Sequence, residues 1–141
     1  MKTAIVIIDG MGGGIGVQLV GRVKEICGNA EVIAIGTNAV AAERMVKAGA
    51  HRGAAGENAV RVAAKTASFI LGPIGIVIAD SMMGEITRVM AEAVLSSPGE
   101  RILLPLQQEH FFIAGLEALS LARMIDKAMD ILKERLEKGS V

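Results

Sequence analysis

Five glycines fall within the seven residues 10–16, directly after a short apolar segment that ends in Asp9. A glycine has no Cβ, so such a run permits a tight turn and lets the backbone approach a bound phosphate closely. If a helix begins after the turn, its free N–H groups and its dipole attract an anion. The segment therefore predicts a phosphate-binding loop made of Gly10, Met11, Gly12, Gly13, Gly14, Ile15 and Gly16. The alternative is that the glycines only permit a sharp turn and close packing.

The spacing of these glycines narrows the class of protein. The strict dinucleotide pattern G-x-G-x-x-G fails in every frame, whereas Gly10, Gly14 and Gly16 fit G-x-x-x-G-x-G, a spacing that resembles the loop of short-chain dehydrogenases. The Tyr-x-x-x-Lys catalytic pair of those enzymes is ruled out because the chain has no tyrosine. A P-loop is ruled out as well, because no Gly-Lys-Ser or Gly-Lys-Thr occurs.

The end of the expected second strand bears on which nucleotide would fit. The acidic residue that normally holds the ribose hydroxyls of NAD is missing there, since Gly36 is followed by Thr37 and Asn38. Arg44 lies two turns into the next helix and could meet a 2′-phosphate, although a solvated or ion-paired arginine is the simpler interpretation. NAD, NADP, FMN and a mononucleotide therefore stay open as ligands.

Other polar residues are expected near the same loop. In an open parallel sheet, ligands bind in the crevice beyond the carboxyl ends of the strands. The strand ends should bring together Asp9, Thr37, Asn38, Gly72, Pro73 and Gln107, with Glu57, Asn58, Asp80 and Ser81 at the border. Of these we take Thr37, Asn38, Asn58, Gly72 and Pro73 as further cofactor-binding candidates.

Two carboxylates near this crevice have competing roles. Asp9 would repel a phosphate unless it were turned away, hydrogen-bonded to loop N–H groups or bridged by a metal, and we favour a structural role in the turn. Glu57 and Asn58 stand at a helix start, where capping and the helix dipole explain them. The alternative is an enzyme that acts on a small phosphorylated metabolite, with Asp9 or Glu57 as the acid–base group.

Apolar periodicity sets the loop in a series of alternating strands and helices. Strands are expected at residues 4–8, 31–36, 68–71 and 101–106. Helices are expected at residues 15–27, 38–48, 57–66 and 119–138, with a further helix between the N-cap candidate Thr87 and a stop at Pro98 and Gly99. Residues 51–56 have no periodicity and read as a loop. Residues 74–79 suit a strand or a buried helix, and we favour the helix.

Only residues 107–110 separate the strand at 101–106 from the apolar run 111–114. That is too few for a parallel crossover, so the run should pair antiparallel at an edge of the sheet. The predicted fold class is α/β: residues 1–141 form a single-domain Rossmann-like three-layer sandwich with a mostly parallel sheet and one antiparallel edge strand.

Composition argues against several kinds of partner. Fifteen acidic and fifteen basic residues cancel and Trp and Tyr are absent, so nucleic acid is not expected. No apolar stretch approaches the length of a membrane span, and we expect a cytoplasmic protein. A 52% apolar content predicts a homo-oligomer, with a dimer favoured. No metal is expected, because Cys27 is the only cysteine and His51 and His110 lack metal-ligand spacing.

Several unusual segments carry a wider resemblance. They are IDGMGGGIG at 8–16, IGTNAVA at 35–41, AGAHRGAAGENA at 48–59, GPIGIVIADSMMGEIT at 72–87 and ILLPL at 102–106. With them the chain resembles, over most of its length, the DUF3842 family of small bacterial Rossmann-like proteins of unknown function. The resemblance implies the fold and the binding loop and implies no reaction. A non-catalytic homo-oligomeric interaction module therefore stays open beside nucleotide binding.

Overall fold

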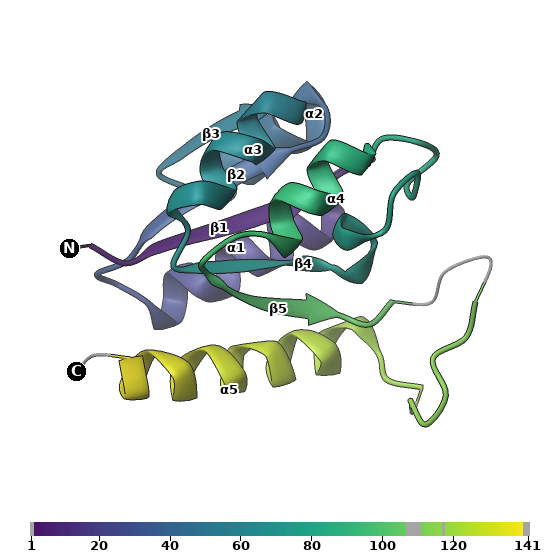
Figure 1. Ribbon diagram of the computed structural model, residues 1–141. Helices are drawn as coiled ribbons and strands as arrows, with labels where there is room; N and C mark the ends of the chain where they lie inside the picture. The colour runs from purple at the N-terminus through teal and green to yellow at the C-terminus, as the bar shows by residue number, and fades with distance from the viewer. Residues whose placement is uncertain (1, 107–110, 117, 140–141) are drawn as a thin grey trace.

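The first strand is the centre of the fold because its run of apolar residues, AIVIID, suits a strand that is covered on both faces. The computed structural model describes residues 2–106, 111–116 and 118–139. It contains a five-stranded sheet of order β3-β2-β1-β4-β5, in which all neighbouring strands are parallel (Figure 1). The strands are β1 (Ala4–Asp9), β2 (Glu31–Gly36), β3 (Arg52–Ala55), β4 (Phe69–Pro73) and β5 (Glu100–Leu104).

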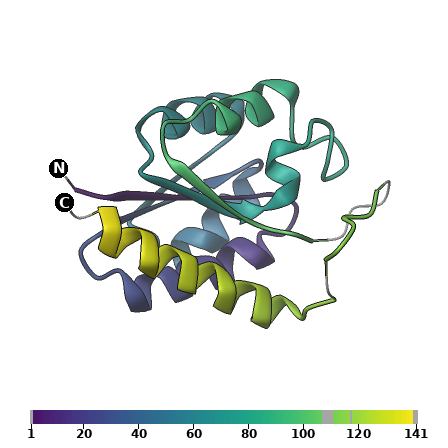
Figure 2. The ribbon, with the colours of Figure 1, turned by 60° about the horizontal axis from the view of Figure 1, so that its bottom comes forward.

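Helices cover both faces of this sheet. One face carries α1 (Gly14–Ile26), α2 (Ala39–Lys47) and α5 (Leu121–Gly139), and α1 and α5 lie side by side on it (Figure 2). The other face carries α3 (Glu57–Thr66), the short 3-10 helix η1 (Ile74–Val77) and α4 (Arg88–Leu95). Strand β1 supplies both cores, because Ile5 and Ile7 point to the first face while Val6 and Ile8 point to the second. The predicted Rossmann-like α/β sandwich is confirmed.

Side-chain caps fix where two of the helices begin. The Asn38 carboxamide oxygen accepts a hydrogen bond of 2.8 Å from the Ala41 N–H at the start of α2. The Thr87 hydroxyl accepts one of 3.1 Å from the Met90 N–H at the start of α4, so the predicted cap at Thr87 is confirmed. Each cap satisfies an N–H group that has no partner inside its helix.

The expectation of a loop at residues 51–56 is wrong, because β3 lies there. Its four residues pair in parallel with β2, from Ile33 opposite Arg52 to Gly36 opposite Ala55. All four are exposed, so they show no alternation of apolar and polar residues. Residues 52–55 are a strand because they pair with β2 at the edge of the sheet. Neither the length nor the composition of this segment indicates a strand.

The expected antiparallel edge strand is also wrong. Within the described residues, the run 111–114 forms no strand, since it contains only an isolated β-bridge at Phe111, and β5 forms the edge of the five-stranded sheet. Segment 74–79 is helical in its first four residues, as the 3-10 helix η1, which agrees with the preference for a helix. Gln107 and His110 lie outside the described residues. None of the helices in the described parts of the chain combines the length and apolar character that a membrane crossing requires.

Gly72 allows β4 to lie close against β1, and this gives a test of the core. A Cβ at Gly72 would stand 2.4 Å from the Ile8 carbonyl oxygen, which is backbone and cannot move aside without shifting the strand. We expect Gly72→Ala to lower the free energy of unfolding by about 1–3 kcal/mol. The control Gly21→Ala adds its Cβ in open space within α1 and should stabilise the protein by up to about 1 kcal/mol. Urea unfolding measures both, and equal effects would contradict the packing argument.

Candidate functional site

The glycine loop is a turn between the end of β1 and the start of α1. The Gly13 N–H donates to the Gly10 carbonyl at 2.9 Å, and Gly13 has a left-handed conformation with φ of 75°. Met11 is also left-handed, with φ of 51°, which is uncommon for a residue with a side chain. The strand–loop–helix context that the sequence predicted is therefore present.

Three of the five glycines have structural reasons to be glycine. A Cβ at Gly10 would approach the Thr37 hydroxyl to 2.5 Å, and one at Gly13 would come within 2.9 Å of the Ala41 backbone. At Gly16 a Cβ would meet the Met45 sulfur at 2.3 Å and the Asp9 Cβ at 2.9 Å. Close packing therefore requires these three glycines: Gly10 against the residue after β2, Gly13 against α2, and Gly16 against α2 and β1.

The other two glycines have no such reason. A Cβ at Gly14 would find no atom within 4 Å, and one at Gly12 would meet only the Arg44 side chain, at 3.4 Å. Both residues are exposed, and neither has a left-handed φ. Packing and the turn therefore leave Gly12 and Gly14 unexplained.

Asp9 ends β1 with its carboxylate turned toward the loop. One oxygen accepts the Gly10 N–H at 2.8 Å and the other accepts the Gly16 N–H at 2.7 Å, while the residue is only 4% exposed. Burial raises the pKa of this carboxyl above its ordinary value of 3.8, and the N–H donors of Gly16, Gly10 and Ile15 oppose the rise. The structural role that we favoured for Asp9 agrees with this geometry.

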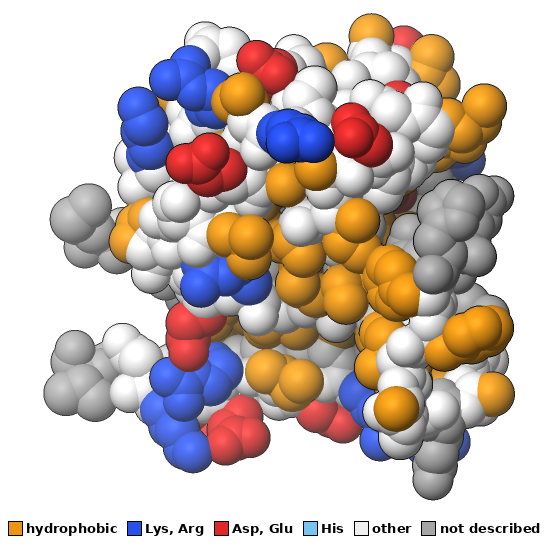
Figure 3. Space-filling model, turned by 45° about the vertical axis from the view of Figure 1, so that its right-hand side comes forward, with side chains coloured by type: hydrophobic (Ala, Val, Ile, Leu, Met, Phe, Trp, Pro, Cys, Tyr) orange, Lys and Arg blue, Asp and Glu red, His pale blue; other side chains and the backbone are white. Residues whose placement is uncertain are grey.

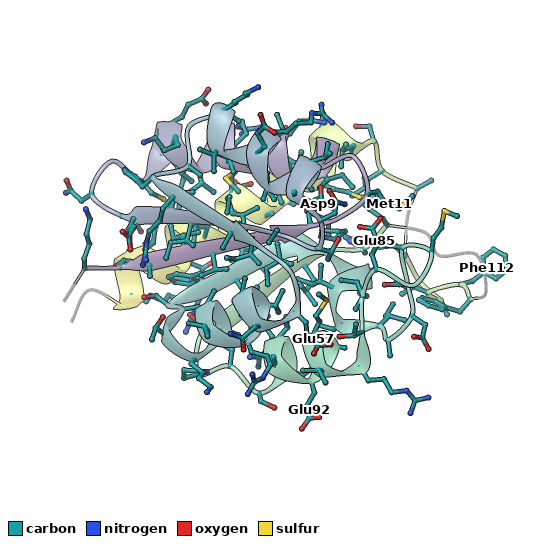
Figure 4. The ribbon with its side chains drawn as sticks, turned by 90° about the horizontal axis from the view of Figure 1, so that it is seen from above. Asp9, Met11, Glu57, Glu85, Glu92 and Phe112 are labelled. Carbon is teal, nitrogen blue, oxygen red and sulfur yellow. The ribbon has the colours of Figure 1, made fainter. Side chains whose placement is uncertain are left out.

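A second carboxylate, which the sequence analysis did not single out, lies at the same edge of the sheet. One oxygen of Glu85 accepts the Met11 N–H at 2.9 Å, the Asn38 amide at 2.8 Å and the Thr37 hydroxyl. These hydrogen bonds, the Thr37 bond foremost, hold the pKa of Glu85 below its ordinary value of 4.5. Figure 4 shows Asp9, Met11 and Glu85 close together at this edge. Glu85 therefore joins the ends of β1 and β2.

Glu85 reaches this place from the segment between η1 and α4. Residues 80–84 of that segment contain three non-glycine residues with positive φ: Asp80 at 68°, Met82 at 57° and Met83 at 56°. The segment is held by the Ser81 hydroxyl, which donates to the Gly75 carbonyl at 2.5 Å, and by the Asp80 N–H, which donates to the Ile86 carbonyl at 2.7 Å. Strained backbone of this kind persists only where surrounding contacts fix it, and it clusters at functional sites.

Arg44, on α2, places a cation at the glycine loop. Its guanidinium donates a hydrogen bond to the Gly12 carbonyl. The Asn38 amide donates to the Met11 carbonyl at 2.8 Å, so α2 holds the loop at both of these residues. The guanidinium of Arg44 is thus used in a hydrogen bond to the glycine loop itself.

Other predicted site residues are not brought to this cluster. Gly72 and Pro73 are buried inside β4, where they pair with β5. Asn58 is exposed on α3, and its side-chain oxygen accepts a bond of 2.7 Å from Arg61. Figure 4 shows Glu57 well apart from Asp9 and Glu85. Asp9 and Glu57, the two alternatives for an acid–base group, therefore lie at separate places, and only Asp9 belongs to this cluster.

The candidate metal ligands are dispersed. Cys27 is buried, and His51 accepts the Val32 N–H at 2.9 Å with one ring nitrogen. Within the described ranges, no three side chains of His, Cys, Asp and Glu gather as ligands for an ion.

The buried position of Asp9 predicts a particular pH dependence. Because its pKa is raised in the folded protein, its contribution to stability is complete below pH 3.8 and is lost as the pH rises through the folded-state pKa. Asp9→Asn should cost about 1–2 kcal/mol near pH 4, since an amide nitrogen cannot accept the Gly10 or Gly16 N–H. The difference in the free energy of unfolding between wild type and Asp9→Asn should become smaller toward neutral pH, as measured by urea unfolding.

Asp130→Asn, on the exposed side of α5, controls for the loss of one negative charge in these titrations. A difference between wild type and Asp9→Asn that stays constant from pH 4 to pH 7 would contradict the raised pKa.

Comparisons with known proteins place the chain in a family but assign it no activity. No curated protein matches it. Among solved structures, it is similar to a nucleoside-diphosphate-sugar epimerase from Pseudomonas aeruginosa at 12% identity and a TM-score of 0.49. The similarity covers 100% of this chain and 50% of that one, so the chain spans about half the length of the epimerase. A family model described as a domain of unknown function matches residues 4–137, and the chain therefore belongs to the DUF3842 family.

Proposed function

We propose that this protein binds a nucleotide, with its phosphate against the backbone of residues 12–14. The observation that carries the proposal is the pair of exposed glycines, Gly12 and Gly14, for which packing gives no reason. Within the described residues, the N–H groups of Gly12 and Gly14 have no acceptor, whereas those of Gly13, Ile15 and Gly16 do. A phosphate at this point would meet both free N–H groups and the start of α1.

Charge near the loop is compatible with an anion. The Asp9 carboxylate is buried and already engaged by backbone N–H groups, so it faces away from the exposed side of the loop. Arg44 holds its guanidinium at Gly12 and could offset the charge of a phosphate. This combination supports an anionic group at residues 12–14, whereas the Glu85 carboxylate at the Met11 N–H leaves that side of the loop to an uncharged part of the ligand.

Sheet topology favours the same place. The strand order reverses between β1 and β4, since α1 leaves β1 over one face while η1 and α4 follow β4 on the other. In open α/β sheets, such a switch point at the carboxyl ends of the strands is where ligands bind. In the proposal Thr37 and Asn38, at the end of β2, contact the rest of the nucleotide, which is NAD, NADP, FMN or a mononucleotide.

A thermal-shift screen tests this proposal. NAD, NADP, FMN, ATP, GTP and inorganic phosphate are each added to the purified protein, and a ligand at 100 times its dissociation constant should stabilise the folded state by about 2.7 kcal/mol. The shift should disappear in Gly14→Val, whose side chain would cover the free N–H groups. Gly21→Val is the matched control, because it adds the same side chain in open space in the same helix.

Two results would count against nucleotide binding. One is the absence of a shift with every ligand, and the other is an equal shift in wild type and in a folded Gly14→Val. The first result would favour the alternative of a non-catalytic interaction module.

We also propose that the protein is a homo-oligomer, with a dimer favoured. Phe112, which lies beyond the carboxyl ends of the strands (Figure 4), is 86% exposed, and Met83, in the segment before α4, is 90% exposed. Apolar side chains gather across the middle and right of the face in Figure 3. Large exposed apolar groups of this kind mark interaction surfaces. A second copy is the partner that the high apolar content of the chain favours.

Analytical ultracentrifugation over a range of concentrations tests the oligomer. Phe112→Ser should weaken self-association at least about tenfold, because exposed aromatic residues dominate interface energies. Val62→Ser removes an apolar side chain that is 57% exposed on α3, near the opposite edge of the sheet, and should leave association unchanged. A monomeric wild-type protein would refute the proposal.

A further inference from the structure

No acidic residue follows β2 in the sequence, but a carboxylate from another part of the chain lies at the end of this strand. In doubly wound nucleotide-binding sheets, a carboxylate at this position accepts the hydroxyls of the ribose. Here Gly36, Thr37 and Asn38 occupy the strand end, and none carries a charge. Glu85 fills the gap from the segment before α4, since its carboxylate accepts hydrogen bonds from both Thr37 and Asn38.

The two oxygens of Glu85 are used differently. Oε1 accepts all three donors: the Met11 N–H, the Thr37 hydroxyl and the Asn38 amide. Oε2 has no hydrogen-bond partner among the residues that the structure describes. The side chain is only partly buried, so Oε2 can receive a donor from outside the protein. The carboxylate is thus fixed at one oxygen and unused at the other.

We propose that Glu85 is the residue that accepts the ribose hydroxyls of the bound nucleotide through Oε2, and that it selects ligands with a free 2′-hydroxyl. This inference rests on the proposed nucleotide site and names the part of the ligand that the site distinguishes. The Met11 bond sets Glu85 beside the first turn of the glycine loop, so ribose at Glu85 leaves residues 12–14 for the phosphate.

Charge makes the same carboxylate reject a 2′-phosphate. Glu85 is held ionised by its three donors, which lower its pKa. A phosphate on the 2′ oxygen would bring two like charges together at hydrogen-bonding distance. Arg44, the cation that the sequence offered for a 2′-phosphate, is bonded to the Gly12 carbonyl instead. The site therefore favours NAD over NADP.

Binding of NAD and NADP to wild type, Glu85→Gln and Glu92→Gln tests the assignment. Calorimetry should show that the wild type binds NAD at least about tenfold more tightly than NADP. In NADP, repulsion between the 2′-phosphate and Glu85 replaces the charge-assisted hydrogen bond that the 2′-hydroxyl of NAD donates. Glu85→Gln keeps the size of the side chain and an oxygen for the three donors, but turns the second oxygen into a donor. The preference for NAD should then fall below about threefold. Glu92→Gln removes an exposed carboxylate away from the loop and should behave as wild type (Figure 4).

A second comparison needs no variant, so it stands even if Glu85→Gln fails to fold. Wild-type protein should bind ATP at least about tenfold more tightly than 2′-deoxy-ATP, since the deoxy sugar cannot donate to Oε2. Equal binding of these two ligands, or an unchanged NAD preference in Glu85→Gln, overturns the role of Glu85 and leaves the proposed nucleotide site standing. A response to inorganic phosphate or FMN alone also overturns it. No response to any ligand overturns both proposals.

Discussion

The carboxylate of Asp9 joins the end of the central strand to the start of the first helix. It accepts N–H groups from both sides of the glycine loop while it is almost completely buried. A buried carboxylate without such donors would be costly, and buried N–H groups without an acceptor would cost free energy as well. The buried carboxylate and the buried N–H groups therefore offset each other's cost of burial. The close approach of the strand and helix also needs a glycine at position 16, because a Cβ there would come within 2.9 Å of the Asp9 Cβ.

Glu85 repeats this logic at the next strand end. Its carboxylate is held by groups from the loop after β1 and from the end of β2, although it belongs to the segment after β4. To place Glu85 there, the segment adopts positive φ at three non-glycine residues, which is unfavourable for the backbone. Its internal hydrogen bonds and the contacts of Glu85 hold this conformation. Two carboxylates thus organise the backbone donors at this edge of the sheet, one from inside and one from the surface. The N–H groups of Gly12 and Gly14, at the start of α1, have no acceptor within the described residues, and both glycines are exposed.

The glycines of the loop separate into two groups once their surroundings are known. Gly10, Gly13 and Gly16 are needed because the loop packs closely against the residue after β2, against α2 and against β1, respectively. Gly12 and Gly14 have space around them, so a side chain there would cost the fold little. The distinction matters because a run of glycines in a sequence is compatible with both packing and ligand binding. In this loop the packing explanation accounts for three positions and leaves two.

The amino-acid sequence by itself determined the alternation of buried strands and amphipathic helices, the cap at Thr87, and the turn that follows Asp9. These features are local, because they depend on periodicity, on a cap and its helix, or on the absence of a Cβ. Only the tertiary structure decided the strand at residues 52–55, the all-parallel sheet of the described chain and the position of Glu85. Residues 52–55 become a strand because β2 offers them an unpaired edge. Glu85 lies 74 residues from Met11 in the chain, and nothing in the spacing of DSMMGEIT signals that the fold brings the two together. Local patterns specify the elements, whereas a site assembled from the ends of different strands depends on how those elements pack.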